Sequence, residues 1–226
     1  MSILVDKSLR DAIESKVIVV DPFDPSLIQP NSLDVRLGNT ECRYIAPGYN
    51  CVINPADEAP RSVSRQVDKV VIKPGEFILV ETMEYFKLPS TIYGEIMGKS
   101  STGRLGIDVE NAGLIDSGFE GTLTLELYNK TKSHTYTLSP GFPIAQIVFY
   151  PCDEVEMSYS QRKTARYLGQ RGATPYRIQT YDANDRTASG EADGTDSAFG
   201  KAIDYFSSRK RKGSSGSKRN STDSGE

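Results

Sequence analysis

Short stretches in which hydrophobic and polar residues alternate cover much of the chain up to residue 150. Residues 121–129, GTLTLELYN, show the pattern most clearly, because three leucines occupy every second position. Successive side chains of a β-strand point to opposite sides, so the leucines share one face and Glu126 lies on the other, with Thr122, Thr124 and Tyr128. Such a carboxylate is either a charge on a solvated strand face, the commoner case, or part of a functional site.

Seven further stretches alternate in the same way or form short apolar runs, and Pro, Gly or polar turn residues follow them. Before them, Leu4, Leu9 and Ile13 have helical spacing and predict one helix at the start of the chain. One helix followed by many short strands predicts an all-β sandwich or jelly roll. The seven stretches are residues 17–20, 31–39, 68–72, 76–82, 91–98, 135–138 and 144–150.

The composition changes near residue 179, where the chain becomes polar and then rich in Ser, Gly and basic residues. We therefore predict a folded domain at residues 1–178 and a polar, largely disordered tail at residues 179–226. Within the tail, residues 197–208 are a candidate short amphipathic helix. The basic run at residues 209–212 is either a solubilising terminus, the commoner case, or a patch for nucleic acid or targeting.

Charge and cysteine content narrow the class of protein. The net charge is −3, which argues against nucleic acid as the main partner, because such binding depends on neutralising phosphates with Lys and Arg. The start of the chain is amphipathic without a continuous apolar run, so we expect neither a signal peptide nor a membrane span. Three cysteines without a CxxC pair make a disulfide framework unexpected and predict a reduced, cytoplasmic setting.

The chain has a single histidine, His134, in a stretch that we expect to connect two strands. A catalytic zinc needs several His or Cys donors together, and no cysteine pair has ligand spacing. A Ser/His/Asp arrangement is equally unexpected with one histidine at a turn. We therefore expect neither a protein-bound zinc nor a serine-hydrolase triad.

Two segments carry candidate chemistry. Residues 98–106, GKSSTGRLG, combine two serines, three glycines and two cations after an apolar strand. Glycines let the backbone approach a ligand, and the cations and hydroxyls can hold phosphate, although ordinary turns share this composition. Asp116 lies ten residues before Glu126 and precedes a Ser-Gly pair. It is either a turn-capping residue or a second carboxylate near the same cleft.

Together these segments resemble the dCTP deaminase branch of the dUTPase superfamily. The resemblance implies a distorted jelly roll or β-barrel of the dUTPase type, with an N-terminal helix. It also implies a homotrimer with active sites at subunit interfaces, a nucleoside triphosphate bound as its Mg²⁺ complex, and no catalytic zinc. The resemblance is carried, in order along the chain, by residues 17–39, 98–106, 112–129, 140–150 and 159–175.

In this family the glutamate of the Leu-Glu-Leu strand is the general base, and Glu126 matches it. The resemblance implies that Glu126 takes a proton from the water that attacks C4 of cytosine and then helps to protonate the departing ammonia. A base with this role works best with a pKa near the operating pH, and a partly dehydrated cleft can raise a carboxyl pKa to that range.

Other positions match substrate-binding residues of the family. Ser100 and Ser101 match serines that contact phosphate, and Arg104 matches an arginine near the catalytic water and the phosphates. Lys99 replaces the usual arginine, which keeps the charge and loses the bidentate geometry. Asp116 matches the aspartate that contacts the deoxyribose 3′-hydroxyl.

The remaining matches concern the base and the end of the nucleotide. Thr124 and Leu125 would border the base beside Glu126, and Gln146 matches a glutamine that some members use at the nucleotide. Three late residues match a Tyr, a Lys and a Gln that close over the triphosphate: Tyr159, Arg166 and Gln170.

The resemblance implies deamination of dCTP to dUTP and ammonia. Residues 112–119 and 169–175 are more similar to the bifunctional members, which continue to dUMP and diphosphate and so supply dUMP for thymidylate synthesis. dUTP and dTTP are further expected ligands, although residues 105–115, the loop that responds to dTTP, are one residue shorter than usual. The alternatives are a dUTP diphosphatase without deamination, which Glu126 disfavours, and a catalytically silent nucleotide-binding relative.

Overall fold

The computed structural model describes residues 3–46, 48, 51–110 and 113–178 of the chain. The chain divides into two units, Met1–Gln179 and Thr180–Glu226, and every described residue belongs to the first unit. The predicted tail at residues 179–226, with its candidate helix at residues 197–208, lies outside the described residues. Within the described ranges, no helix combines the length and the apolar character needed to cross a membrane.

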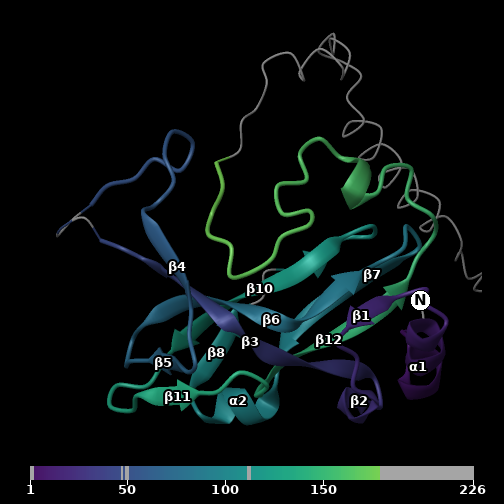
Figure 1. Cartoon of the computed structure of the whole chain (residues 1–226), viewed down its shortest axis with the longest axis horizontal. Coiled ribbons are helices and arrows are strands. Elements are labelled where there is room, and N and C mark those ends of the chain that lie inside the picture. Colours follow the sequence, from purple (N-terminus) through teal and green to yellow (C-terminus); the bar gives the residue numbers. More distant parts are fainter. Residues whose placement is uncertain (1–2, 47, 49–50, 111–112, 179–226) are drawn as a thin grey trace, which may run out of the picture. The chain divides into compact units, whose positions relative to one another are not determined.

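Strands are the main regular structure of the described chain, as the alternating pattern predicts (Figure 1). Within the described residues, ten strands make one antiparallel sheet in the order β8–β10–β6–β3–β12–β7–β9, with β1 on β6 and with β2 and β4 on β3. Strands β5 and β11 pair separately. The strands are β1 Val19–Asp21, β2 Ile28–Gln29, β3 Ser32–Tyr44, β4 Ser62–Gln66, β5 Val70–Ile72, β6 Phe77–Lys87, β7 Ile92–Gly98, β8 Ile107–Glu110, β9 Leu114–Ile115, β10 Glu120–Asn129, β11 Tyr136–Leu138 and β12 Pro143–Pro151.

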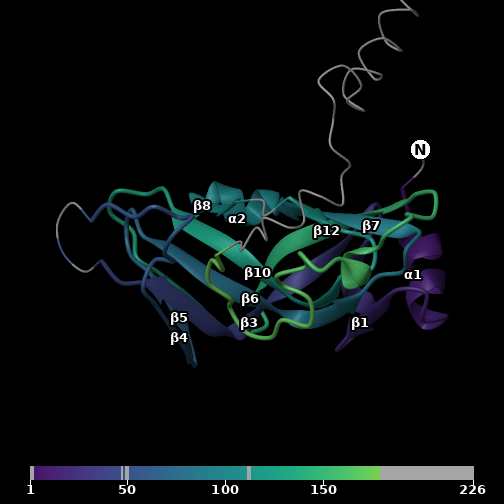
Figure 2. The same cartoon turned by 90° about the horizontal axis from the view of Figure 1, so that it is seen from above.

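The sheet is curled around its apolar side. Figure 2 shows β7, β8 and β12 along one side and β1, β3 and β4 along the other, with β6 and β10 between them. The core gathers apolar residues from all of these parts, among them Phe86 of β6, Leu127 of β10 and Phe149 of β12, each with no exposed surface. The strand pattern alone therefore predicted the all-β fold class.

The predicted N-terminal helix is confirmed as α1, Asp6–Glu14, which buries Leu9 and Ile13. A second helix, α2 (Ser100–Arg104), lies within the candidate phosphate-binding segment at residues 98–106. Its Thr102 is fully buried and donates a hydrogen bond to the Ile144 carbonyl oxygen (3.3 Å), which fixes the short helix against β12. The described part of the chain also contains two 3₁₀ turns, η1, Pro25–Leu27, and η2, Tyr159–Gln161.

The pairing of β10 with β6 is irregular near the start of β10. Thr122 lies opposite Tyr85 and Thr124 opposite Glu81, so β6 carries the extra residues and bulges there. The backbone N–H of Leu123 donates to the hydroxyl of the fully buried Thr82 (3.0 Å) instead of to a ladder partner. The Thr122 and Thr124 hydroxyls both meet the C-terminal segment, at the Gln170 carbonyl oxygen (3.4 Å) and the Thr174 N–H (3.1 Å), as expected of side chains on one face of β10.

A buried carboxylate joins three strands at the far end of β3. Glu41 is 1% exposed and accepts hydrogen bonds from Arg43 (2.8 and 2.9 Å) and from Arg65 of β4 (2.8 Å). Arg43 also donates to the Val71 carbonyl oxygen of β5 (2.7 Å). Burial raises the pKa of Glu41, but the hydrogen bonds and charges of the two arginines outweigh burial and lower it below its ordinary value of 4.5.

Replacing Glu41 with glutamine should lower the free energy of unfolding at neutral pH by about 2 kcal/mol, since it weakens hydrogen bonds to charged groups. A lowered carboxyl pKa stabilises the fold above the unfolded-state pKa, and this contribution disappears as the pH falls through the folded-state pKa. The difference between wild type and variant should therefore be constant above pH 4.5 and shrink below it. Urea unfolding at a series of pH values measures this difference.

The control is Glu14→Gln, an exposed carboxylate at the end of α1. It should leave stability unchanged at neutral pH. A Glu41→Gln penalty that persists undiminished at acidic pH would show that the lost interaction does not depend on the carboxylate charge.

Candidate functional site

A cavity of about 490 Å³ lies beside β10, and its volume is in the range of small-molecule sites. Strands supply one wall through Phe77 and Leu79 of β6, Ile96 of β7, and Leu123, Thr124 and Glu126 of β10. The other walls come from β9 with the residues on either side of it and from residues 158–178, which we call the C-terminal arm. From these parts the cavity is lined by Gly113, Leu114, Ile115, Asp116, Phe119, Tyr159, Tyr167, Gln170, Thr174 and Tyr176, and Tyr44 of β3 completes it.

Glu126 is half-buried on β10, opposite Leu79 of β6 and Glu110 of β8 in the strand register. Its neighbours in the cavity wall include the apolar side chains of Leu79, Ile96 and Leu123. A carboxylate held among apolar groups at the side of a cavity is well placed to exchange protons with a bound ligand. This position makes Glu126 a residue of the cavity wall instead of a charge on an open strand face.

Tyr44 places a hydroxyl in the same cavity. Burial raises the pKa of Tyr44, and the negative charge of Glu126 acts in the same direction. The hydroxyl therefore stays protonated at neutral pH. It accepts a hydrogen bond from the backbone N–H of Tyr176 (3.2 Å), which attaches the C-terminal arm to the end of β3.

Asp116 lies on the wall formed by the turn after β9. Its carbonyl oxygen accepts from the Phe119 N–H (3.0 Å) and closes the turn, while its exposed side chain lines the cavity. At Gly118, φ is +81°, and a Cβ atom there would come within 2.6 Å of Ser158 Cβ. The glycine thus lets the arm begin against the turn and brings Tyr159 to the same cavity wall as Asp116.

Tyrosine hydroxyls hold the C-terminal arm over the cavity. The Tyr159 hydroxyl accepts from the Tyr167 N–H (3.1 Å), and the Tyr167 hydroxyl accepts from the Arg177 N–H (3.3 Å). The Tyr176 hydroxyl donates to the Pro55 carbonyl oxygen in the β3–β4 loop (2.9 Å). These bonds join parts of the arm to each other and to the body of the domain, so the arm forms an ordered wall.

Two arm residues that the sequence singled out have different positions. Gln170 is buried and lines the cavity; its amide donates to the Thr122 carbonyl oxygen (2.7 Å), and its Oε1 has no partner among the described residues. Arg166 does not line the cavity. Its guanidinium donates to the Arg177 carbonyl oxygen (2.8 Å) and lies over the rings of Tyr167 and Tyr176.

Of the residues predicted for the site, the cavity brings together Asp116, Thr124, Glu126, Tyr159 and Gln170. Leu125 is not among the lining residues, because its side chain points into the apolar core, where it is 1% exposed. The Leu125 side chain therefore does not line this cavity, and the place of Leu125 beside the base stays a prediction.

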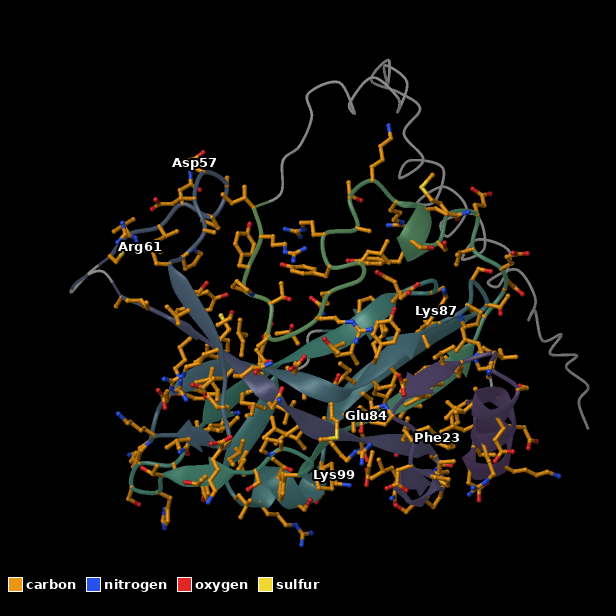
Figure 3. All side chains as sticks on the ribbon, in the orientation of Figure 1. Phe23, Asp57, Arg61, Glu84, Lys87 and Lys99 are labelled. Atoms are coloured by element: carbon orange, nitrogen blue, oxygen red, sulfur yellow. The ribbon has the colours of Figure 1, made fainter. Side chains whose placement is uncertain are left out.

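The predicted phosphate-binding residues lie elsewhere on the domain. Ser100, Ser101 and Arg104 belong to α2, which Figure 1 shows at the opposite end of the sheet from the arm, and Figure 3 shows Lys99 on that side. None of the four lines the cavity.

Gln146 of β12 lines a second, open depression of about 400 Å³ together with Lys99 and Asp34. Lys99 forms an ion pair with Asp34, whose other carboxylate oxygen is buried without a partner among the described residues. The Gln146 Oε1 accepts a hydrogen bond from the Ser32 hydroxyl (3.4 Å). The predicted site residues thus form two separate groups on one chain.

The sequence did not indicate the aromatic side of the cavity. Tyr44, Phe77 and Tyr176 lie far apart in the chain, and the rings of Tyr44 and Phe77 stack with centroids 6.3 Å apart. No local pattern marks these residues, because they meet only through the strand order and the path of the arm. The described residues also contain no group of three or more His, Cys, Asp or Glu side chains placed to hold a metal ion.

Comparisons with known proteins show which family the chain is similar to. A family model described as dCTP deaminase-like matches residues 3–152. The chain is 43% identical over 190 residues to a Methanoculleus marisnigri protein named "dCTP deaminase, dUMP-forming", covering 82% of this chain and 98% of that one. A Hydrogenobaculum sp. protein of the same name is 44% identical over 176 residues, which cover 78% of this chain and 96% of its own.

Among solved structures, the fold is similar to that of the 2′-deoxycytidine 5′-triphosphate deaminase from Agrobacterium tumefaciens, with a TM-score of 0.50 and 26% identity. The match covers 65% of this chain and 47% of that one, so the similarity spans just under half of the Agrobacterium chain. The predicted jelly roll of the dUTPase type with an N-terminal helix is confirmed. The chain belongs to the dCTP deaminase-like family.

Proposed function

We propose that this protein hydrolyses dCTP in two steps, first to dUTP and ammonia and then to dUMP and diphosphate. The observation that carries the proposal is the position of Glu126, half-buried among apolar residues in the wall of a cavity that also contains Asp116. The names of the relatives, dCTP deaminases that form dUMP, support the same reaction.

In the first step Glu126 is the general base. It accepts a proton from a water molecule, the resulting hydroxide adds to C4 of the cytosine ring, and the same carboxyl group delivers protons to the amino group that leaves as ammonia. Leu79, Ile96 and Leu123 restrict water around the carboxylate, which favours proton transfer.

In the second step a water molecule attacks the α-phosphorus of dUTP, and diphosphate leaves with the bonding electrons. Asp116 holds the deoxyribose 3′-hydroxyl and orients this second water. Its turn keeps the carboxylate at the cavity and close to Tyr159 of the arm. The two hydrolyses would thus share one bound nucleotide, which supports direct formation of dUMP.

The triphosphate requires a source of positive charge that the cavity lacks. Among the described residues that line it there is no Lys or Arg, although phosphate binding relies on such side chains. The helix α2 contains three of the predicted phosphate-binding residues, Ser100, Ser101 and Arg104, and Lys99 directly precedes it. We therefore propose that α2 of a second copy completes each site, in a homotrimer.

The nucleotide enters as its Mg²⁺ complex, in which phosphate oxygens hold the metal. The described residues offer no cluster of donors for a separately held ion, which is consistent with a metal that arrives with the substrate. dTTP, as a close analogue of the product dUTP, is expected to compete for the same cavity.

The deciding experiment incubates purified full-length protein with Mg²⁺ and either dCTP or dUTP. We expect dCTP to yield ammonia and dUMP in equal amounts with little free dUTP, measured by coupled ammonia detection and by chromatography of the nucleotides. Accumulation of dUTP would limit the activity to deamination. Release of dUMP from dUTP without ammonia from dCTP would indicate a diphosphatase, and turnover of neither would indicate a silent relative.

A further inference from the structure

Glu81 is a buried carboxylate on β6 that lies outside the cavity. It is 8% exposed, and its Oε2 accepts a hydrogen bond from the backbone N–H of Gly172, 91 positions later in the chain (2.7 Å). Charged side chains are seldom buried unless a partner compensates for the lost hydration. Here the partner belongs to the C-terminal arm, so the position of the carboxylate is tied to that of the arm.

Three features of the backbone make room for this contact. The pairing of β6 shifts register on both sides of Glu81, with β10 and with β3. A Cβ atom at Gly38 of β3 would lie 2.5 Å from the Glu81 Cγ, so glycine leaves space for the side chain. At Gly172, φ is +80°, a conformation that favours glycine and aims its N–H at the carboxylate.

Other hydrogen bonds hold the arm to β10 on both sides of this contact along the chain. Before it, the Gly169 N–H donates to the Glu120 carbonyl oxygen (2.7 Å), and the Thr122 N–H donates to the Gln170 carbonyl oxygen (3.0 Å). After it, the Thr174 N–H donates to the Thr124 hydroxyl (3.1 Å). The arm therefore runs along the start of β10, where the pairing of β10 with β6 is irregular, and Glu81 supplies the only charged acceptor among these bonds.

Positive charge on the arm lies near the same place. Arg171, next to Gly172, lies over the ring of Tyr85 at 4.4 Å, and Arg171 and Arg65 line the same open depression as Glu81, of about 720 Å³. The arm is thus held from this side by a carboxylate and by a cation–π contact. On its other side it carries the cavity-lining residues Tyr167, Gln170, Thr174 and Tyr176.

We infer that Glu81 is a positioning residue, which fixes the C-terminal arm at Gly172 so that the arm's side of the nucleotide cavity exists before the ligand binds. Residues that are already ordered lose little conformational entropy when the ligand binds, which favours affinity. The catalytic consequence rests on the proposed function, whereas the anchoring of the arm does not.

The test compares Glu81→Leu, which removes the acceptor at similar volume, with Glu81→Gln, which keeps an acceptor oxygen. Without nucleotide, trypsin should cut Glu81→Leu about tenfold faster than wild type at Lys163, Arg166 and Arg171, because loss of a hydrogen bond to a charged group shifts the arm toward release. Mass spectrometry measures the cleavage rate at each site. Glu81→Gln should remain within about threefold of wild type.

In steady-state kinetics, Glu81→Leu should raise the KM for dCTP about tenfold and change kcat by less than about threefold, because it weakens the binding wall and leaves Glu126 in place. Glu14→Leu, at an exposed carboxylate of α1, is the matched control. It should change neither the cleavage rate of the arm nor the kcat and KM for dCTP. Thermal unfolding of each variant identifies any general loss of stability.

Wild-type cleavage of the arm in Glu81→Leu would overturn the inference, whatever the protein does to dCTP. An equal increase in the cleavage rate of the arm in Glu81→Gln and Glu81→Leu would also overturn it. Packing of the side chain, and not the acceptor oxygen, would then hold the arm. Faster cleavage in Glu81→Leu alone, in a protein without any dCTP turnover, would support the anchor and reject the proposed function.

Discussion

Replacing Glu126 with glutamine should abolish ammonia release from dCTP, with a loss of about a thousandfold or more in kcat, since positioned general bases contribute on that scale. The substitution removes the group that accepts the proton and changes side-chain volume little. Glu126 lies in the strand wall of the cavity and not in the arm or in α2, so binding of the triphosphate should change by less than about threefold.

Ammonia release under saturating dCTP measures the first effect, and calorimetric titration with dCTP measures the second. The matched control is Glu95→Gln on β7, a half-buried carboxylate that accepts from the Tyr150 hydroxyl (3.0 Å) and does not line the cavity. It should retain near wild-type activity. Ammonia formed by Glu126→Gln at the wild-type rate would refute the role of Glu126.

Replacing Arg104 with alanine should raise the KM for dCTP by about a hundredfold, because truncating one partner of a charged contact costs on the order of 2–5 kcal/mol. Arg104 lies in α2, away from the cavity that contains Glu126 (Figure 1). If one chain supplies Glu126 and another supplies Arg104, the two variants damage different parts of a shared site.

Coexpression of Arg104→Ala with Glu126→Gln tests this arrangement. Random mixing in trimers should restore about a quarter of the sites, those that combine an intact glutamate with an intact arginine from the neighbour. At dCTP concentrations far below the raised KM of Arg104→Ala, the mixture should therefore be far more active than either variant alone, and light scattering should give the mass of three chains. Activity no higher than that of the parents would place both residues of each site on one chain.

The fold was largely predictable because the signals that define it are local. Leu9 and Ile13 share a helix face within two turns, and Leu125 and Leu127 share a strand face within three residues. The position of α2 was not predictable in the same way. Its five residues form a helix because Thr102 is buried against Ile144, a contact that the local composition of residues 98–106 does not reveal.

The candidate site was predictable in part. Glu126 and Asp116 were found from their motifs, and the cavity contains both. Strict alternation placed Thr122 beside them, but Thr122 lines the depression that contains Glu81, where extra residues of β6, among them Thr82, interrupt the pairing of the two strands. A bulge depends on which partner strand offers an acceptor, and that information is not contained in either strand alone.

By itself the sequence determined the strands, the helix at the start, the core faces and the residue types of the chemistry, because these depend on neighbours within a few positions. The tertiary structure decided which of those residues meet. It brought Tyr44, Asp116, Glu126 and Gln170 around one cavity and left α2 outside it. The reason is physical: a site between a curled sheet and an arm about fifty residues later depends on long-range pairing, such as that between Gly121 and Gln170, and no local periodicity encodes it.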